Sequence, residues 1–106
     1  MQKTEKEIQN TIQTTGQMVL RLRQASDNVW NYVNLHMEEL IFTMMAVVEW
    51  AQQLIESGGD FPIDVVLQQI QNLNEAYTAK DEVLLADTLE YEIQNTLQVY
   101  LEKGEE

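Results

Sequence analysis

The chain has 106 residues, no cysteine and a net charge of −12, from 18 acidic and 6 basic residues. This length suits one domain, and the missing cysteines exclude disulfides, thiolate metal sites and cysteine nucleophiles. No lysine or arginine lies between Gln24 and Ala79. Because acidic surfaces repel polyanions, we expect neither nucleic acid nor anionic lipid as a partner, and a basic partner or simple solubility explains the charge better.

The sequence predicts neither export nor membrane insertion. Residues Met1–Glu7 have no apolar run behind their lysines, unlike a signal peptide. The most apolar stretch, Leu40–Val48, has nine residues, whereas a membrane span needs about 20. We therefore expect a cytoplasmic protein that does not bind membranes, which also fits the absence of cysteine.

Apolar residues recur at spacings of three and four, which indicates helices. The first predicted helix, residues 4–24, has one apolar face, formed by Ile8, Ile12, Thr15, Val19 and Leu22. Gly16 lies inside this helix, where glycine costs about 1 kcal/mol relative to alanine. We therefore expect the first turns to be frayed or bent.

The second predicted helix, about residues 27–57, is the longest. Ser26, Asp27 and Asn28 can each accept a hydrogen bond from a free backbone N–H one turn on, so we expect them to cap it. Its apolar residues follow an unbroken heptad a/d pattern, which we call the seam: Trp30, Val33, Met37, Leu40, Met44, Val47, Ala51 and Leu54. Other apolar residues widen this stripe, as is typical of a bundle core. They are Ile41, Val48 and Ile55 beside the seam, and Leu35 and Phe42 on another flank.

The ends of the later helices are marked by turn-forming residues. Gly58–Gly59 ends the second helix, since glycine adopts the left-handed conformation without a steric penalty. Pro62 suits the start of a third helix, about residues 62–78, because its missing N–H costs nothing there. A break at Lys80–Asp81 leads to a fourth helix, about residues 81–103.

These elements predict an all-α fold, an up-down bundle of four helices in a single domain of residues 1–106. The long central helix is apolar on more than one side, so it leaves surface for a protein partner. The simplest partner is a second copy of the chain, and we predict a homodimer. The residues expected on this oligomer or partner surface are Ile41, Met45, Val48 and Trp50.

An acidic and aromatic patch is the second candidate site. Asp87, Glu90 and Tyr91 share one face of the fourth helix, at positions i, i+3 and i+4. Such a patch can bind a cation or a basic helix, and it can equally be a solvated helix face. We therefore take these three residues as a candidate partner-binding patch.

The same region carries a resemblance to known proteins. Leu84–Glu92 reads LLADTLEYE and follows Lys80–Asp81. It resembles the C-terminal LLADxLEYE motif of a family of small uncharacterised bacterial helical proteins, over about residues 75–100. That family is associated with motility gene neighbourhoods. The resemblance implies a bacterial helical protein, and it implies no activity.

No group of residues predicts catalysis, a cofactor or a metal site. His36 is the single histidine, whereas di-iron bundles use Glu-x-x-His on two helices. All-α nucleotide pyrophosphohydrolases, which hold magnesium through carboxylates, carry a Glu-Glu-x-x-Glu run and a later Glu-x-x-Asp run. Here Glu38–Glu39 is followed by Phe42 at the position of the third glutamate, and Leu84 stands three residues before Asp87. We therefore do not expect an enzyme.

Three functions remain as hypotheses. The first is a non-catalytic protein-interaction module, suggested by the wide apolar stripe and the acidic surface. A narrower version is similar to flagellar or type III export chaperones, which are short, acidic and helical and grip an amphipathic helix of their cargo. The second is a metal-dependent all-α nucleotide pyrophosphohydrolase, which would use Glu38, Glu39, Glu49 and Asp87. The third is a structural or regulatory dimer whose surface binds nothing specific.

Overall fold

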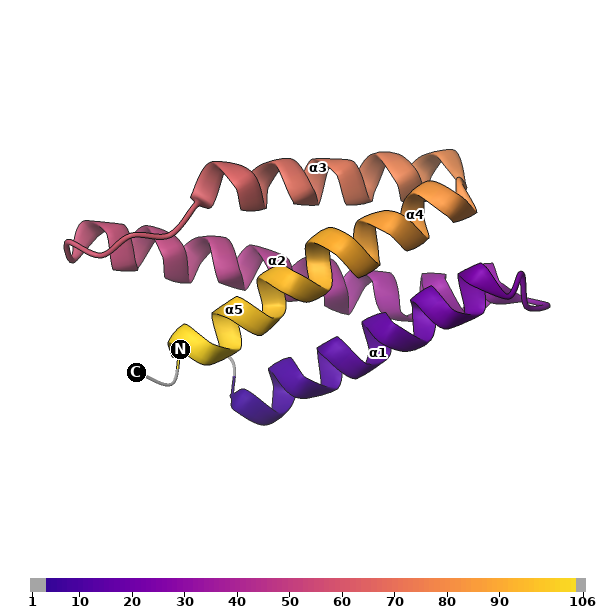
Figure 1. The fold of residues 1–106 in the computed structure, drawn as a ribbon, viewed down its shortest axis with the longest axis horizontal. Coiled ribbons are helices and arrows are strands. Elements are labelled where there is room, and N and C mark those ends of the chain that lie inside the picture. The colour runs from indigo at the N-terminus through magenta and orange to yellow at the C-terminus, as the bar shows by residue number, and fades with distance from the viewer. Residues whose placement is uncertain (1–3, 105–106) are drawn as a thin grey trace.

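The structure, a computed structural model, describes residues 4–104, so residues 1–3 and 105–106 of the predicted domain lie outside it. Within the described range the chain is all-α, with four helices and no strand, as predicted (Figure 1). The first three helices are α1 (Glu5–Arg23), α2 (Val29–Glu56) and α3 (Ile63–Ala79). The fourth, which we call the C-terminal helix, joins three segments: α4 (Glu82–Thr88), the π-helical η1 (Leu89–Ile93) and α5 (Gln94–Gly104).

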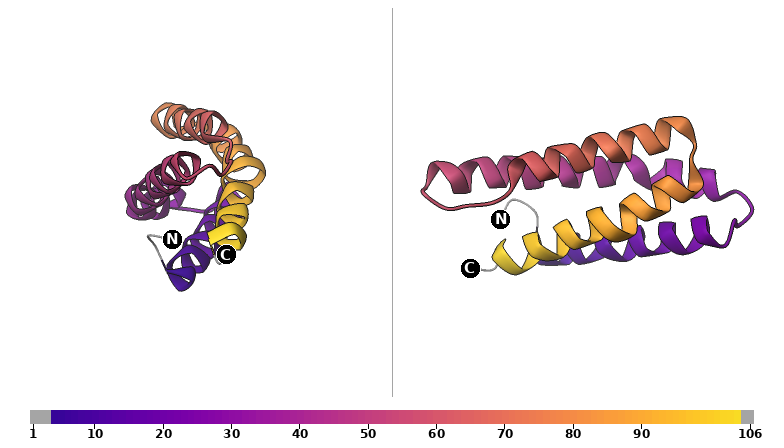
Figure 2. Two further views of the ribbon diagram at one scale, coloured as in Figure 1. Left: turned by 90° about the vertical axis from the view of Figure 1, so that its left-hand side faces the viewer. Right: turned by 45° about the horizontal axis from the view of Figure 1, so that its top comes forward.

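The four helices run alternately up and down in an elongated bundle of 46 × 25 × 19 Å (Figures 1 and 2). Each helix packs against the next one in the sequence, and α1 closes the bundle by packing along the C-terminal helix. Contact across the diagonal, between α2 and α5, is slight. The inner side of α2 is therefore covered mainly by α1 and α3.

The core follows the predicted seam of α2. Six consecutive seam residues are buried: Val33, Met37, Leu40, Met44, Val47 and Ala51. The two seam residues at the ends, Trp30 and Leu54, are half-buried. The α1 face is confirmed as well, since Ile8, Thr15, Val19 and Leu22 are buried. A spacing of three and four keeps these residues on one side of each helix, so burial follows the periodicity.

All three interhelical turns begin in the same way. A residue one or two positions past the helix end has a left-handed backbone: Ala25 (φ 50°), Gly58 (φ 91°) and Lys80 (φ 56°). After α2, the N–H groups of Gly58 and Gly59 donate to the carbonyls of Ile55 and Leu54, which is the Schellman pattern. The same two bonds form at the ends of α1 and α3, where the N–H groups of Ala25 and Lys80, and of the residue after each, donate to carbonyls of the last helical turn. Glycine marked the turn after α2 in the sequence, and a break was also predicted at Lys80–Asp81, whereas Ala25 gives no such signal.

The predicted side-chain cap of α2 is wrong. Asn28 is the N-cap residue, but its backbone is left-handed (φ 59°, ψ 25°) and its side chain makes no capping bond. The side chains that do cap a helix belong to residues whose backbone is extended. Thr4 (ψ 157°) accepts from the N–H of Glu7, and Asp81 (ψ 100°) accepts from the N–H of Leu84. An extended backbone directs the side chain toward the free N–H groups of the first turn, and Asn28 lacks that geometry.

The prediction of frayed first turns in α1 is wrong, since the α-helix is continuous from Glu5 to Arg23 and includes Gly16. Gly16 lies where the C-terminal helix approaches α1. A Cβ atom added at Gly16 would lie 3.2 Å from Nε2 of Gln94. That amide also makes a long hydrogen bond, 3.4 Å, to the carbonyl of Ile12. Gly16 therefore provides room for Gln94 between the two helices.

Candidate functional site

Several large apolar side chains are exposed on the side of α2 that faces away from the core, which we call the outer face of α2. It runs from Leu35 to Gln52. Leu35, Phe42 and Met45 on this face are 74%, 67% and 60% exposed. Leu35 and Phe42 line one groove and Phe42 and Met45 another, so these exposed side chains are neighbours, and clustered apolar side chains mark interaction sites more often than scattered ones do.

Phe42 lies at the centre of this face. Three shallow grooves with volumes of about 570, 420 and 400 Å³ adjoin α2, and Phe42 lines all three. Met45 lines two of them, and Tyr77 of α3 forms a wall of the smallest. Each groove also contains a glutamate, either Glu38 or Glu49. The face is therefore apolar at its middle and acidic along its length.

The structure brings together three of the four residues predicted for an oligomer or partner surface. Met45 is exposed, and the half-buried Ile41 and Val48 line grooves beside Phe42. Trp50 lies elsewhere. Its ring packs edge-on against Phe61 and Tyr100, with ring centroids 5.1 and 5.0 Å apart. Trp50 therefore closes the core at one end of the bundle.

Phe42 was not among the predicted site residues, although the sequence holds a signal for it. In the heptad that places the seam at positions a and d, Leu35 and Phe42 both fall at position f. Position f points away from the core, where a polar residue is expected. Two large apolar residues at f, one heptad apart, indicate a second contact face.

The second candidate site, Asp87, Glu90 and Tyr91, is paired within the chain. Arg23 at the end of α1 donates from Nη2 to Oδ1 of Asp87 at 2.9 Å and to Oε2 of Glu90 at 3.1 Å. Its guanidinium also lies 5.9 Å from the centre of the Tyr91 ring. We call these four residues the Arg23 cluster. It joins α1 to the C-terminal helix on a half-exposed surface.

Charge in the Arg23 cluster shifts two pKa values. The hydrogen bond to Asp87, followed by the bond to Glu90 and the charges of both carboxylates, raises the pKa of Arg23 above its ordinary value. Hydrogen bonding to Glu90, together with its negative charge, raises the pKa of Tyr91, and the charge of Arg23 opposes this in part. The shift of the Arg23 pKa thus reflects its bonds to both carboxylates, whereas the shift of the Tyr91 pKa reflects its bond to Glu90.

The π-helical segment η1 covers the last four residues of the LLADTLEYE string, Leu89–Glu92, and Ile93 after it. Leu89 and Ile93 at its two ends are fully buried, and Tyr91 between them is exposed. Glu90 accepts from Arg23 of α1, and Glu92 accepts from the side-chain amide of Asn72 of α3 at 3.1 Å. The segment thus directs one carboxylate to each neighbouring helix. π-Helical turns often occur at functional sites, and these contacts give this one a packing role.

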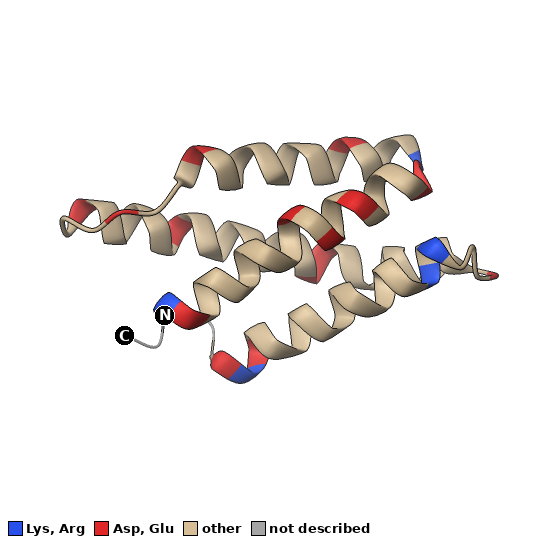
Figure 3. Cartoon of the chain, viewed as in Figure 1, with Lys and Arg blue, Asp and Glu red and all other residues tan. Residues whose placement is uncertain are grey.

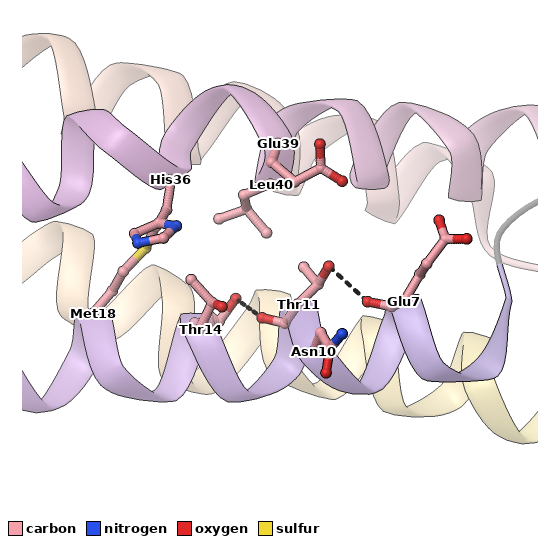
Figure 4. A pocket seen from close by; sticks show the side chains of 9 residues that line it. Glu7, Asn10, Thr11, Thr14, Met18, His36, Glu39 and Leu40 are labelled. Carbon is pink, nitrogen blue, oxygen red and sulfur yellow. Dashed lines mark hydrogen bonds between the residues drawn. The ribbon is translucent and has the colours of Figure 1, made fainter.

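A cavity of about 170 Å³ lies between α1 and α2 (Figure 4). It is lined by Glu7, Asn10, Thr11, Thr14, Thr15, Met18, His36, Glu39 and Leu40. The hydroxyls of Thr11 and Thr15 donate to backbone carbonyls one turn earlier in α1, and the ring of His36 lies 4.5 Å from that of Tyr32. The volume is below the roughly 300–1,000 Å³ of small-molecule sites.

The acidic residues weighed for magnesium are placed apart. Glu38, Glu39 and Glu49 lie along α2, whereas Asp87 is bonded to Arg23 at the α1–α4 contact. Across residues 4–104, no three His, Asp or Glu side chains converge in a way that could hold a metal ion. None of the helices in that range is long and apolar enough to cross a membrane.

Comparisons of the chain with known protein families, with characterised proteins and with solved structures found no match. The resemblance of the LLADTLEYE string to a bacterial family therefore stays a prediction. Function has to be inferred from the two surfaces, the outer face of α2 and the Arg23 cluster.

Proposed function

We propose that this chain is a non-catalytic protein-interaction module that contacts its partner through the outer face of α2. One observation carries the proposal: Phe42 is 67% exposed at the centre of three grooves. Burying a phenylalanine side chain contributes about 1.5–3 kcal/mol. Aromatic residues of this kind, at the middle of an interface, supply much of its binding energy.

Two kinds of occupant are proposed for this face. The first is a second copy of the chain, which would make the homodimer predicted from the sequence. The second is an amphipathic helix of another protein, as in an export-chaperone-like role. Either would cover Phe42 and Met45 and leave the core of the bundle unchanged.

A photo-crosslinking amino acid at position 42 tests the proposal. Val83 on α4 is a matched control, because it is 68% exposed on a different helix. We expect position 42 to give a defined adduct, either with a second copy of the purified protein or with one protein in the cell of origin. Position 83 should give none. The proposal is wrong if neither position, or both equally, forms an adduct.

Substitution supplies a second readout. Phe42→Asp should abolish the adduct of a crosslinker placed at Met45, because a carboxylate would have to be desolvated in the contact. Val83→Asp should leave it unchanged. Because both changes are at exposed positions, we expect both variants to keep the helical bundle. Far-ultraviolet circular dichroism checks this.

A further inference from the structure

We infer that the occupant of the outer face of α2 is a basic amphipathic helix of another protein rather than a second copy of this chain. This inference rests on the proposed function, and it names the partner of the same surface. Three observations carry it: the charge of the grooves, the position of the basic residues, and the length of the face.

Glutamates line each of the grooves around Phe42. Phe42 lines all three grooves, and the glutamates that join it are Glu38, Glu39 and Glu49. No residue that lines these three grooves is a lysine or arginine. A partner that covers Phe42 must therefore approach carboxylates, and lysine or arginine side chains at the rim would neutralise them.

Basic residues lie only at the ends of the described helices or in the turns beside them (Figure 3). Within residues 24–79 the sequence has eight acids and no lysine or arginine. The nearest base that follows, Lys80, lies against the rings of Trp30 and Tyr77, at 4.8 and 5.0 Å. Residues 24–79 therefore contain no cation to neutralise the glutamates of the outer face.

Charge opposes a second copy at this surface. Each copy has a net charge of −12. Two α2 helices packed antiparallel about Phe42 would bring Glu38 and Glu49 of both copies to one interface, with no basic residue on either α2. Like charges across an interface cost several kcal/mol, and partly desolvated carboxylates without partners add to that cost.

The length of the face fits one helix. From Leu35 to Gln52, α2 extends roughly 26 Å at 1.5 Å per residue. The smallest groove lies between α2 and α3, where the hydroxyl of Tyr77 donates to Oδ1 of Asn34 at 2.6 Å and holds the two helices together. A helix of about five turns laid along this face would cover Phe42 and Met45 with its apolar side. Its basic residues would reach Glu38 and Glu49.

Two synthetic peptides of about 18 residues test the inference. The first is an acetylated and amidated helix with leucines on one face and lysines on the other. The second has glutamate in place of each lysine. We expect the leucine–lysine peptide to bind the full chain and to shift backbone NMR signals within residues 35–52. The leucine–glutamate peptide should bind at least about tenfold more weakly. Raised salt should lower the affinity of the leucine–lysine peptide for the chain.

Matched charge variants show whether binding is local. The double change Glu38→Lys and Glu49→Lys should lower the affinity of the chain for the leucine–lysine peptide at least about tenfold. The double change Glu75→Lys and Glu102→Lys alters the net charge equally on exposed positions of α3 and α5, and it should change the affinity by less than about twofold. An equal loss in both double variants, or NMR shifts spread over all helices, would overturn the inference by showing nonspecific attraction.

Failure of the inference can be told from failure of the proposed function. If sedimentation equilibrium at micromolar concentration shows a dimer that Phe42→Asp abolishes and Val83→Asp does not, a second copy is the occupant. The inference is then wrong and the proposed function holds. If neither peptide binds, no dimer forms and position 42 gives no crosslink, both are wrong.

Discussion

The outer face of α2 and the Arg23 cluster both combine an exposed aromatic ring with carboxylates, yet the fold treats them differently. In the Arg23 cluster, Asp87 and Glu90 bond to Arg23 of α1. On the outer face of α2, no described basic residue lines the grooves around Phe42. Tyr91 and Phe42 are almost equally exposed, at 69% and 67%, so exposure alone does not separate the two sites.

The comparison suggests a criterion: an acidic and aromatic pattern is available to a partner only where the chain does not already pair its carboxylates. In the Arg23 cluster a new cation would have to displace a guanidinium that already bonds two carboxylates. On the outer face of α2, no described lysine or arginine lines the grooves around Phe42, and burial of apolar surface would add to any charge pairing. This difference favours α2 as the contact surface.

The largest expected effect separates the two sides of α2. Leu40 is buried in the seam, so Leu40→Ala should lower the free energy of unfolding by about 2–5 kcal/mol. Phe42→Ala, two residues away on the outer face, should change it by about 0.5 kcal/mol or less. Urea denaturation of both variants measures this. A neutral Leu40→Ala would place the seam on the wrong side of the helix.

The next effect tests how α1 meets the C-terminal helix, the contact that brings Arg23 to its carboxylates. Gly16→Leu should lower the free energy of unfolding by about 1–3 kcal/mol, because the side chain has to displace Gln94. Gly16→Ala should be near neutral or stabilise by up to about 1 kcal/mol. Its Cβ lies 3.2 Å from a flexible side-chain end, and alanine favours a helix. Thermal melts that rank alanine below leucine would contradict this contact.

A smaller effect tests the ion pairs of the Arg23 cluster. Arg23→Gln should slightly lower the melting temperature at low salt, and the difference should shrink as salt is added, because half-exposed ion pairs are screened. Arg21→Gln is the control: Arg21 lies 4.3 Å over the Tyr32 ring, a cation–π contact in place of a carboxylate pair. Equal salt dependence in both variants would argue against the pairing.

The smallest effect is a titration. Since Glu90 raises the pKa of Tyr91, the protonated phenol is favoured in the folded state. Its contribution to stability is complete below the unfolded value of about 10 and is lost as the pH rises through the higher folded value. Glu90→Gln should lower the pKa of Tyr91, measured by NMR of its ring. Glu92→Gln, which removes the charge of a carboxylate that accepts from Asn72 of α3, should leave it unchanged.

Local signals predicted the fold well. The unbroken heptad of α2 identified the buried seam, and Gly58–Gly59 identified the end of α2, because both depend only on neighbouring residues. The turns at Ala25 and Lys80 were not specified in the same way. Their left-handed backbones are held by helix-terminal hydrogen bonds rather than by a residue type that prefers them.

The candidate sites were predicted less completely. Ile41, Met45 and Val48 do lie around one surface, but its centre is Phe42, and Trp50 belongs to the core beside Phe61 and Tyr100. Trp50 is next to the seam in the heptad, and heptad position alone does not tell which neighbour will cover such a residue. That depends on where α5 and the loop before α3 are placed.

By itself the sequence determined that this chain forms an all-α bundle with one long central helix, because helical periodicity and turn residues act over a few positions. Only the tertiary structure decided which exposed carboxylates bond to a basic residue of the same chain. Arg23 reaches Asp87 and Glu90 across 64 and 67 residues of sequence, and no local pattern encodes that pairing. Packing of α1 along the C-terminal helix therefore occupies one acidic patch with an internal cation and leaves the outer face of α2 open.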